Sequence, residues 1–109
     1  MSKEAMKPEQ LISNIKVEIE SLISLYGQGS EGQTDLGIKL DSLELSSEIK
    51  EQVVGLIKQA IEESTYNLLC GLEGSASIAG TQECYEIKDE SGNILSGELD
   101  SLFYEQIME

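Results

Sequence analysis

The chain has 109 residues, of which 39% are hydrophobic, and its 21 acids outnumber its 7 basic residues to give a net charge of −14. All the basic residues are lysines, and arginine, histidine and tryptophan are absent. This composition argues against nucleic acid and anionic membranes as partners, because both are bound through cations, and it excludes imidazole as a proton shuttle or metal ligand.

The length predicts one domain, which we expect over residues 7–109, with residues 1–6 as a disordered N-terminus. The first residues lack the basic and then apolar order of a signal peptide. No apolar run approaches the ~20 residues that a membrane helix needs. We therefore expect a cytoplasmic protein in which Cys70 and Cys84 are reduced.

The first predicted element is an amphipathic helix over about residues 8–26. Apolar residues recur from Leu11 to Tyr26 at three- and four-residue spacing, which is the period of one helix face. Pro8 suits the first turn of a helix, and Gly27 suits its end. The apolar stripe of this helix can pack in the core or pair with a second copy of the chain.

Residues 27–37 are rich in glycine and polar residues, which is typical of a flexible loop. The segment Gly27-Gln-Gly-Ser-Glu-Gly32 matches the G-x-G-x-x-G pattern of dinucleotide sites, but such a site needs a strand before the glycines and a helix directly after them. Here a helix comes first and Glu31 would repel phosphate, so we interpret the segment as an ordinary loop. The near-alternation of apolar residues over 36–40 predicts a short extended segment.

A second, longer helix is expected over about residues 47–70. Ser46 or Ser47 can cap its first turn, and Gly71 suits its end. Gly55 lies inside it at a cost of about 1 kcal/mol relative to alanine, which would be offset if it permits close helix packing.

The remaining residues change period. Residues 76–78 predict a short strand, and polar and apolar residues alternate over 83–88, turn at 89–93 and return over 94–96, which predicts an antiparallel β-hairpin over about 83–96. The apolar spacing after it predicts a short C-terminal helix over about 98–108. The expected fold class is therefore α+β, with the two longer helices packed on a small hairpin.

Two patterns could carry chemistry, and we interpret both as structural. Asp89-x-Ser91-x-Asn93 resembles the oxygen ligands of a calcium loop, but Ile94 stands where such a loop needs glycine and no helix precedes it, so weak divalent-cation binding is the most we expect. A serine or cysteine nucleophile would need a base, and histidine is absent. We expect no catalytic, cofactor-binding or metal site, and an enzyme with a carboxylate site is the less favoured alternative.

The acidity is concentrated after residue 58, since residues 59–109 hold eleven acids and a single lysine, Lys88. An acidic surface steers a basic partner, and the layout resembles that of small acidic bacterial immunity-type proteins. We therefore expect a non-enzymatic protein-binding module, an inhibitor of bacterial or phage origin that binds a basic protein. An accessory or structural subunit that forms a homodimer through the apolar stripe of the first helix is the alternative. The candidate contact residues are Glu83, Glu86, Asp89, Glu90, Glu98, Asp100, Tyr104 and Glu105.

Overall fold

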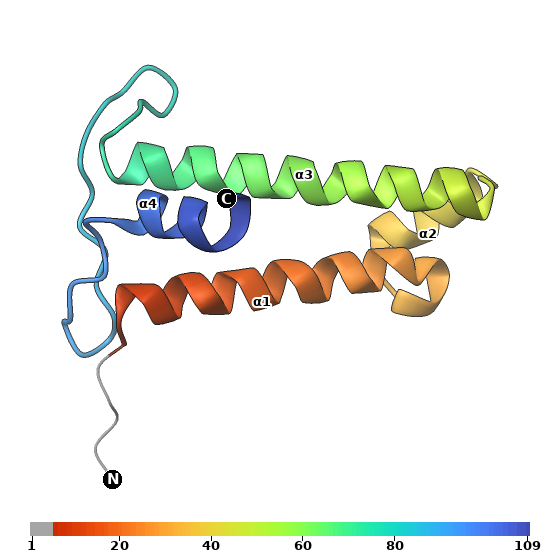
Figure 1. Ribbon diagram of the computed structural model, residues 1–109, viewed down its shortest axis with the longest axis horizontal. Coiled ribbons are helices and arrows are strands. Elements are labelled where there is room, and N and C mark those ends of the chain that lie inside the picture. The colour runs from red at the N-terminus through yellow and green to blue at the C-terminus, as the bar shows by residue number, and fades with distance from the viewer. Residues whose placement is uncertain (1–5) are drawn as a thin grey trace, which may run out of the picture. The chain divides into compact units, whose positions relative to one another are not determined.

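The computed structural model describes residues 6–109, which form helices and connecting segments in two compact units (Figure 1). Unit 1 joins the stretch that ends at Lys16 to Glu63–Glu109, and unit 2 is Val17–Glu62. Helices α1 (Pro8–Gly27) and α3 (Ser47–Leu72) each contribute residues to both units. The expectation of a single domain over 7–109 stays a prediction, and residues 1–5 of the expected disordered N-terminus lie outside the described residues.

Helix α1 confirms the predicted helix, with Pro8 in its first turn and Gly27 at its end. Ile12 is fully buried and Ile19 is 8% exposed, so the helical period locates the covered face correctly. Every residue of the predicted apolar stripe is buried or half-buried: Leu11, Ile12, Ile15, Ile19, Leu22, Ile23 and Tyr26. This stripe therefore spends most of its apolar area inside the protein.

Two short helices of unit 2 follow α1, and the extended segment expected over 36–40 is wrong. The segment η1 (Gly29–Gly32) is a 3-10 helix, and α2 (Asp35–Ser42) is an α-helix. Thr34 begins α2 because its hydroxyl accepts a hydrogen bond from the backbone N–H of Gly37 at 2.9 Å, which satisfies a donor of the first turn. Leu40 is buried but Ile38 is 50% exposed, so the apparent alternation does not describe a strand face.

Helix α3 confirms the second predicted helix and extends it by two residues to Leu72. The Ser46 hydroxyl accepts from the backbone N–H of Ile49 at 3.2 Å, which is the predicted cap. Gly55 is exposed, and a Cβ added there would meet nothing within 4 Å, so close packing does not explain this glycine.

The β-hairpin expected over 83–96 and the strand expected over 76–78 are both wrong. Within residues 6–109, β-pairing is confined to two isolated bridges, Ile78 with Thr81 and Lys88 with Ile94. Pairing does not extend from the Lys88–Ile94 bridge because the backbone N–H of Ile87 donates to the Ser96 hydroxyl at 3.0 Å. The backbone N–H of Tyr85 donates to the carbonyl of Leu72 at 2.9 Å, so this residue bonds to the end of α3. The expected α+β fold class is therefore wrong, and the described chain is all-α.

The core of unit 1 forms around the C-terminal helix, which the sequence predicts over about 98–108. It begins as α4 (Leu99–Phe103) and continues as the π-helical turn η2 (Tyr104–Met108). Figure 1 shows α4 between the first part of α1 and the last part of α3. Phe103 is fully buried and Leu99 is 1% exposed. Burial of each such side chain contributes about 2–3 kcal/mol, so these two residues hold α4 in place.

Candidate protein-binding surface

The side chain of Glu73 connects the two ends of the segment between α3 and α4, residues 73–98. The Glu73 carboxylate accepts hydrogen bonds from the backbone N–H of Gly97, at 2.8 and 2.7 Å to its two oxygens, and from the N–H of Leu99 at 2.7 Å. These donors lie at the start of α4, where backbone N–H groups lack partners within the helix and the helix dipole favours negative charge. Glu73 therefore joins the two ends of the 73–98 segment and orients α4.

The predicted turn at 89–93 is present and is built around the Asp89 carboxylate. Its Oδ1 accepts from the backbone N–H groups of Ser91 and Asn93, and its Oδ2 accepts from the Asn93 side-chain amide, each at 2.9 Å. The hydrogen bonds from the Asn93 side chain and then its backbone N–H hold the pKa of Asp89 below its ordinary value. Gly92 takes φ +87°, as a tight turn requires.

The same hydrogen bonds bear on the calcium-like pattern Asp89-x-Ser91-x-Asn93. Both oxygens of Asp89 already accept hydrogen bonds within the turn, which favours the interpretation as a polar turn. Among residues 6–109, no group of three or more histidine, cysteine, aspartate or glutamate side chains is placed to hold a metal ion.

Asp100 is the second half-buried acid of the predicted contact set, and it too has structural bonds. Its Oδ2 accepts from the Ser75 hydroxyl at 2.7 Å, and its Oδ1 accepts from the backbone N–H of Ser101 at 2.9 Å. Ser75 follows α3 closely in the chain, so this bond is a second tie between the 73–98 segment and α4. Asp89 and Asp100 therefore organise the fold of unit 1.

The aromatic residues at the C-terminal helix divide between core and surface. The Tyr66 ring lies 6.4 Å from that of Phe103 and 5.8 Å from that of Tyr104. Phe103 is fully buried, whereas Tyr104 is 48% exposed. A hydrogen bond with Cys70, and then the nearby negative charges, raise the pKa of Tyr66. Tyr104 is thus a large side chain held on one side by Tyr66 and open on the other.

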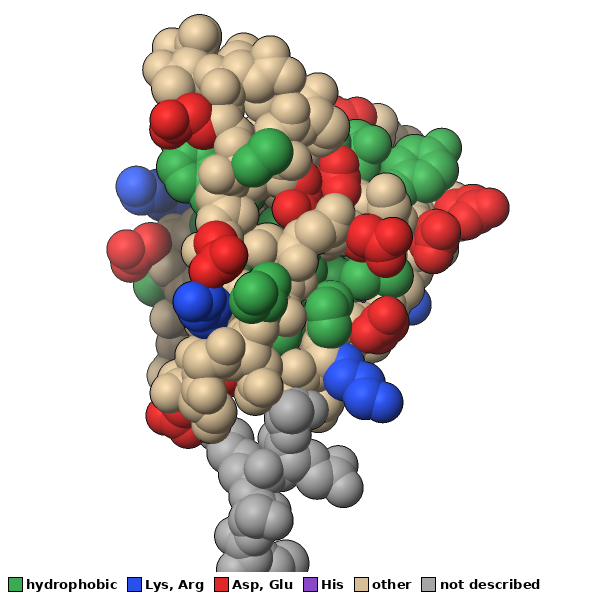
Figure 2. Space-filling view, turned by 90° about the vertical axis from the view of Figure 1, so that its left-hand side faces the viewer, with side chains coloured by type: hydrophobic (Ala, Val, Ile, Leu, Met, Phe, Trp, Pro, Cys, Tyr) green, Lys and Arg blue, Asp and Glu red, His purple; other side chains and the backbone are tan. Residues whose placement is uncertain are grey.

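Six of the eight predicted contact residues are exposed, and we name these six the acidic surface: Glu83, Glu86, Glu90, Glu98, Tyr104 and Glu105. The first three lie in the 73–98 segment, and the last three lie at or next to α4 and η2. Glu86 also pairs with Lys88 at 2.9 Å, with both side chains more than half exposed. Figure 2 shows acidic side chains spread over this end of unit 1 with hydrophobic side chains between them, so the acids do not merge into one patch.

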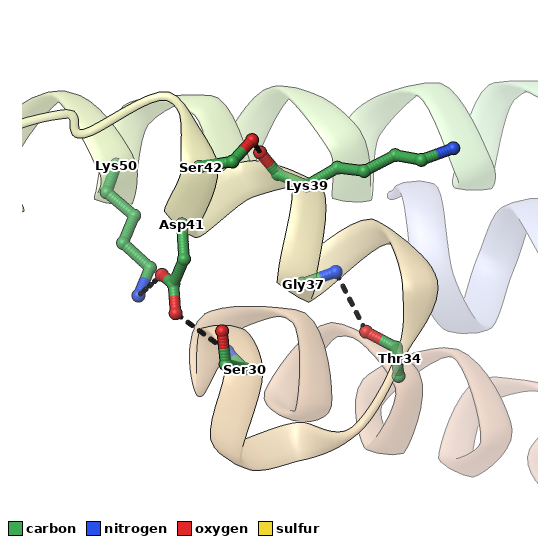
Figure 3. Close-up of polar contacts among 7 residues, drawn as sticks. All are labelled: Ser30, Thr34, Gly37, Lys39, Asp41, Ser42 and Lys50. Atoms are coloured by element: carbon green, nitrogen blue, oxygen red, sulfur yellow. Dashed lines mark hydrogen bonds and ion pairs between the residues drawn. The ribbon is translucent and has the colours of Figure 1, made fainter.

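A phosphate site in the glycine-rich segment of unit 2 would need free backbone N–H groups. In this segment the backbone N–H of Ser30 donates to the carboxylate of Asp41 (Figure 3). Asp41 accepts from the backbone N–H of Ser30 at 2.7 Å and pairs with the Lys50 ammonium at 3.2 Å. The bond from the Ser30 backbone is the main cause that lowers the pKa of Asp41. Helix α1 precedes these glycines, as the sequence analysis expects, but the segment forms η1 and not an irregular loop.

Sequence reasoning missed both Glu73 and Asp41. Each of these carboxylates bonds to backbone N–H groups that lie 11 or more residues away in the chain. The only signal at Asp41 is indirect, because Gly29, at φ +61°, leaves room for that carboxylate. A Cβ at Gly29 would lie 2.4 Å from the Asp41 oxygens, so glycine is required there.

Unit 2 contains a hollow with a volume of about 330 Å³. It is lined by Gly27, Ser47, Lys50, Glu51 and Val54. Its one ammonium group, that of Lys50, is paired with Asp41. In the described part of the chain, no buried side-chain nitrogen or oxygen lacks a hydrogen-bond partner. Among the described residues, the hollow thus has no buried, unsatisfied side-chain polar atom that would indicate a ligand.

Cys70 is half-buried and Cys84 is exposed, and both are free thiols, as the sequence analysis expects. No helix in residues 6–109 has the length and apolarity to cross a membrane. No protein-family model, curated protein or solved structure matches the chain.

Proposed function

We propose that this chain is a non-enzymatic protein-binding module that binds a basic protein through the acidic surface of unit 1. One observation carries the proposal: residues 73–109 hold nine acids and one lysine, and six of the nine acids are exposed. A surface with this charge attracts a cationic partner over roughly 10 Å at 0.1 M salt and raises the rate of encounter.

The exposed acids of this region are different residues from the acids whose hydrogen bonds stabilise the fold. The half-buried acids of this region, Glu73, Asp89 and Asp100, accept hydrogen bonds from backbone N–H groups or from Ser75. Glu83, Glu86 and Glu90 project from the 73–98 segment, which these bonds tie to α3 and α4. A tied segment loses less conformational entropy on binding than a free one, which favours recognition by this surface.

The chemistry of the partner follows from the charges. The chain has no arginine and only Lys88 in this region, so the partner supplies the cations. Clusters of lysine and arginine are typical of surfaces that bind nucleic-acid phosphates, and several exposed carboxylates can occupy such a surface. The proposed role is therefore that of an inhibitor or immunity-type protein of bacterial or phage origin, with Tyr104 as an aromatic anchor.

A pair of charge-matched variants tests the proposal. The test variant carries Glu83→Gln, Glu98→Gln and Glu105→Gln on the acidic surface, and the control carries Glu18→Gln, Glu20→Gln and Glu31→Gln on exposed positions of unit 2. Each variant and the unchanged chain is immobilised and exposed to lysate of the native host at 0.1 and 0.5 M NaCl. Bound proteins are identified and quantified by mass spectrometry.

We expect one basic protein to be captured by the unchanged chain and by the control, and at least tenfold less of it by the test variant. Salt at 0.5 M should reduce the capture by a similar factor, since it shortens the range of the charges. Capture that ignores salt, or an equal loss in both variants, would show that the acidic surface does not recognise the partner.

A further inference from the structure

Helix α3 carries an apolar row on its outer side, separate from the acidic surface. Ile49, Val53, Leu56 and Ala60 recur at spacings of four, three and four residues, which is the a/d pattern of a coiled-coil seam. Ile49 is 45% exposed and Leu56 is 67% exposed. Val53 is half-buried and Ala60 is exposed. We name these four residues the α3 seam.

The α3 seam is not the face that α3 turns to the interior of unit 2. The half-buried apolar residues Val54, Ile57 and Ile61 mark that interior face. At ~100° per residue, the centre of the α3 seam lies about a quarter-turn away from this face. Apolar residues thus extend around α3 beyond its interior face, with Val53 half-buried and the other three seam residues exposed.

The charge of the surroundings indicates which occupant suits the α3 seam. Three of the four seam residues lie in the stretch 52–61, which contains no acid and one lysine, Lys58, in a chain of net charge −14, whereas Ile49 lies between Glu48 and Glu51. A basic partner gains nothing from an acid-free surface. A second copy of this acidic chain, in contrast, meets the least repulsion where carboxylates are absent.

We propose that a second copy of the chain packs on the α3 seam, with the two α3 helices antiparallel about a two-fold axis. This arrangement sets Ile49 of one copy opposite Ala60 of the other, and Val53 opposite Leu56, so a large residue faces a smaller one at each step. The next seam position after Ala60 is Glu63. A parallel pair would place the two copies of this glutamate together, whereas the antiparallel pair separates them.

The size of the α3 seam sets the strength of the dimer. From Ile49 to Ala60 the helix rises about 16 Å, so the contact is roughly half the ~800 Å² per partner of a standard interface. A contact this small is typical of weak, transient complexes, so we expect a dimer that forms only at high protein concentration. Added salt should strengthen the dimer, because it screens the repulsion between two chains of charge −14, whereas salt should weaken binding of a basic partner.

Sedimentation equilibrium of the full chain from about 10 to 1000 µM, at 0.05 and 0.5 M NaCl, tests the proposal. We expect a monomer–dimer equilibrium whose dissociation constant falls severalfold at the higher salt. Leu56→Glu should raise the dissociation constant at least tenfold, whereas Val17→Glu, which changes a 65% exposed apolar residue outside the α3 seam, should leave it unchanged. Far-UV circular dichroism checks that both variants keep their helices.

Cross-linking tests the orientation in a chain that also carries Cys70→Ser and Cys84→Ser. Under mild oxidation, a mixture of Ile49→Cys and Ala60→Cys chains should form mixed dimers, and each variant alone should not. A chain that stays monomeric, a dimer insensitive to Leu56→Glu, a dimer weakened by salt, or self-linking of Ile49→Cys would each overturn the proposal. The triple glutamine variant of the acidic surface should still dimerise, so this proposal and the proposed function can fail separately.

Discussion

Replacement of Glu73 tests whether its carboxylate secures the start of α4. It accepts from the N–H groups of Gly97 and Leu99 at 2.7–2.8 Å, at the start of α4. Hydrogen bonds to a charged group contribute a net 1.5–3 kcal/mol each when buried, and less when partly hydrated, as they are here. We therefore expect Glu73→Ala to lower the free energy of unfolding by about 2–3 kcal/mol.

Glu73→Gln should cost about half as much, since the amide keeps one acceptor oxygen but loses the charge that favours the helix N-terminus. Glu20→Ala, at an exposed site on α1, should stay within about 0.5 kcal/mol of the unchanged chain. Urea unfolding followed by circular dichroism at 222 nm measures all three variants. If Glu73→Ala is as stable as Glu20→Ala, the carboxylate does not hold α4 and the reasoning is refuted.

Two further predictions concern a glycine and an acid of the turns. Gly29→Ala should lower the free energy of unfolding by at least about 1 kcal/mol, because alanine at φ +61° is strained and its Cβ would clash with the Asp41 carboxylate. Gly27→Ala should be neutral or stabilising, because a Cβ at Gly27 has nothing within 4 Å. Equal melting temperatures for the two variants would contradict this reasoning. Asp89 has a folded-state pKa below its ordinary value of 3.8, so the stability it contributes is present at neutral pH and is lost as the pH falls below about 4. Asp89→Asn should therefore lower the melting temperature at pH 7 more than at pH 3, and an equal loss at both pH values would speak against the role of its charge.

The sequence predicts which residues of unit 1 are candidates for contact, but not which of them are exposed. Tyr104, one of these candidates, is exposed, and the neighbouring Phe103 is buried. Sequence alone does not separate Asp89 and Asp100, which are occupied in structural bonds, from exposed acids such as Glu83 and Glu98. The sequence does not indicate whether a carboxylate accepts hydrogen bonds from a backbone N–H group or from water.

The sequence by itself determined the two long helices, because the helical period repeats over enough residues in α1 and α3 to outweigh any single position. It also determined the turn at Asp89, where the bonds run between near neighbours. Only the tertiary structure decided that residues 83–88 form no strand, since Tyr85 bonds to Leu72. It likewise decided the roles of Glu73 and Asp41, whose partners are distant in the chain. The conformation of the short segments depends on their tertiary contacts with the long helices, and those contacts produce no periodic pattern in the sequence.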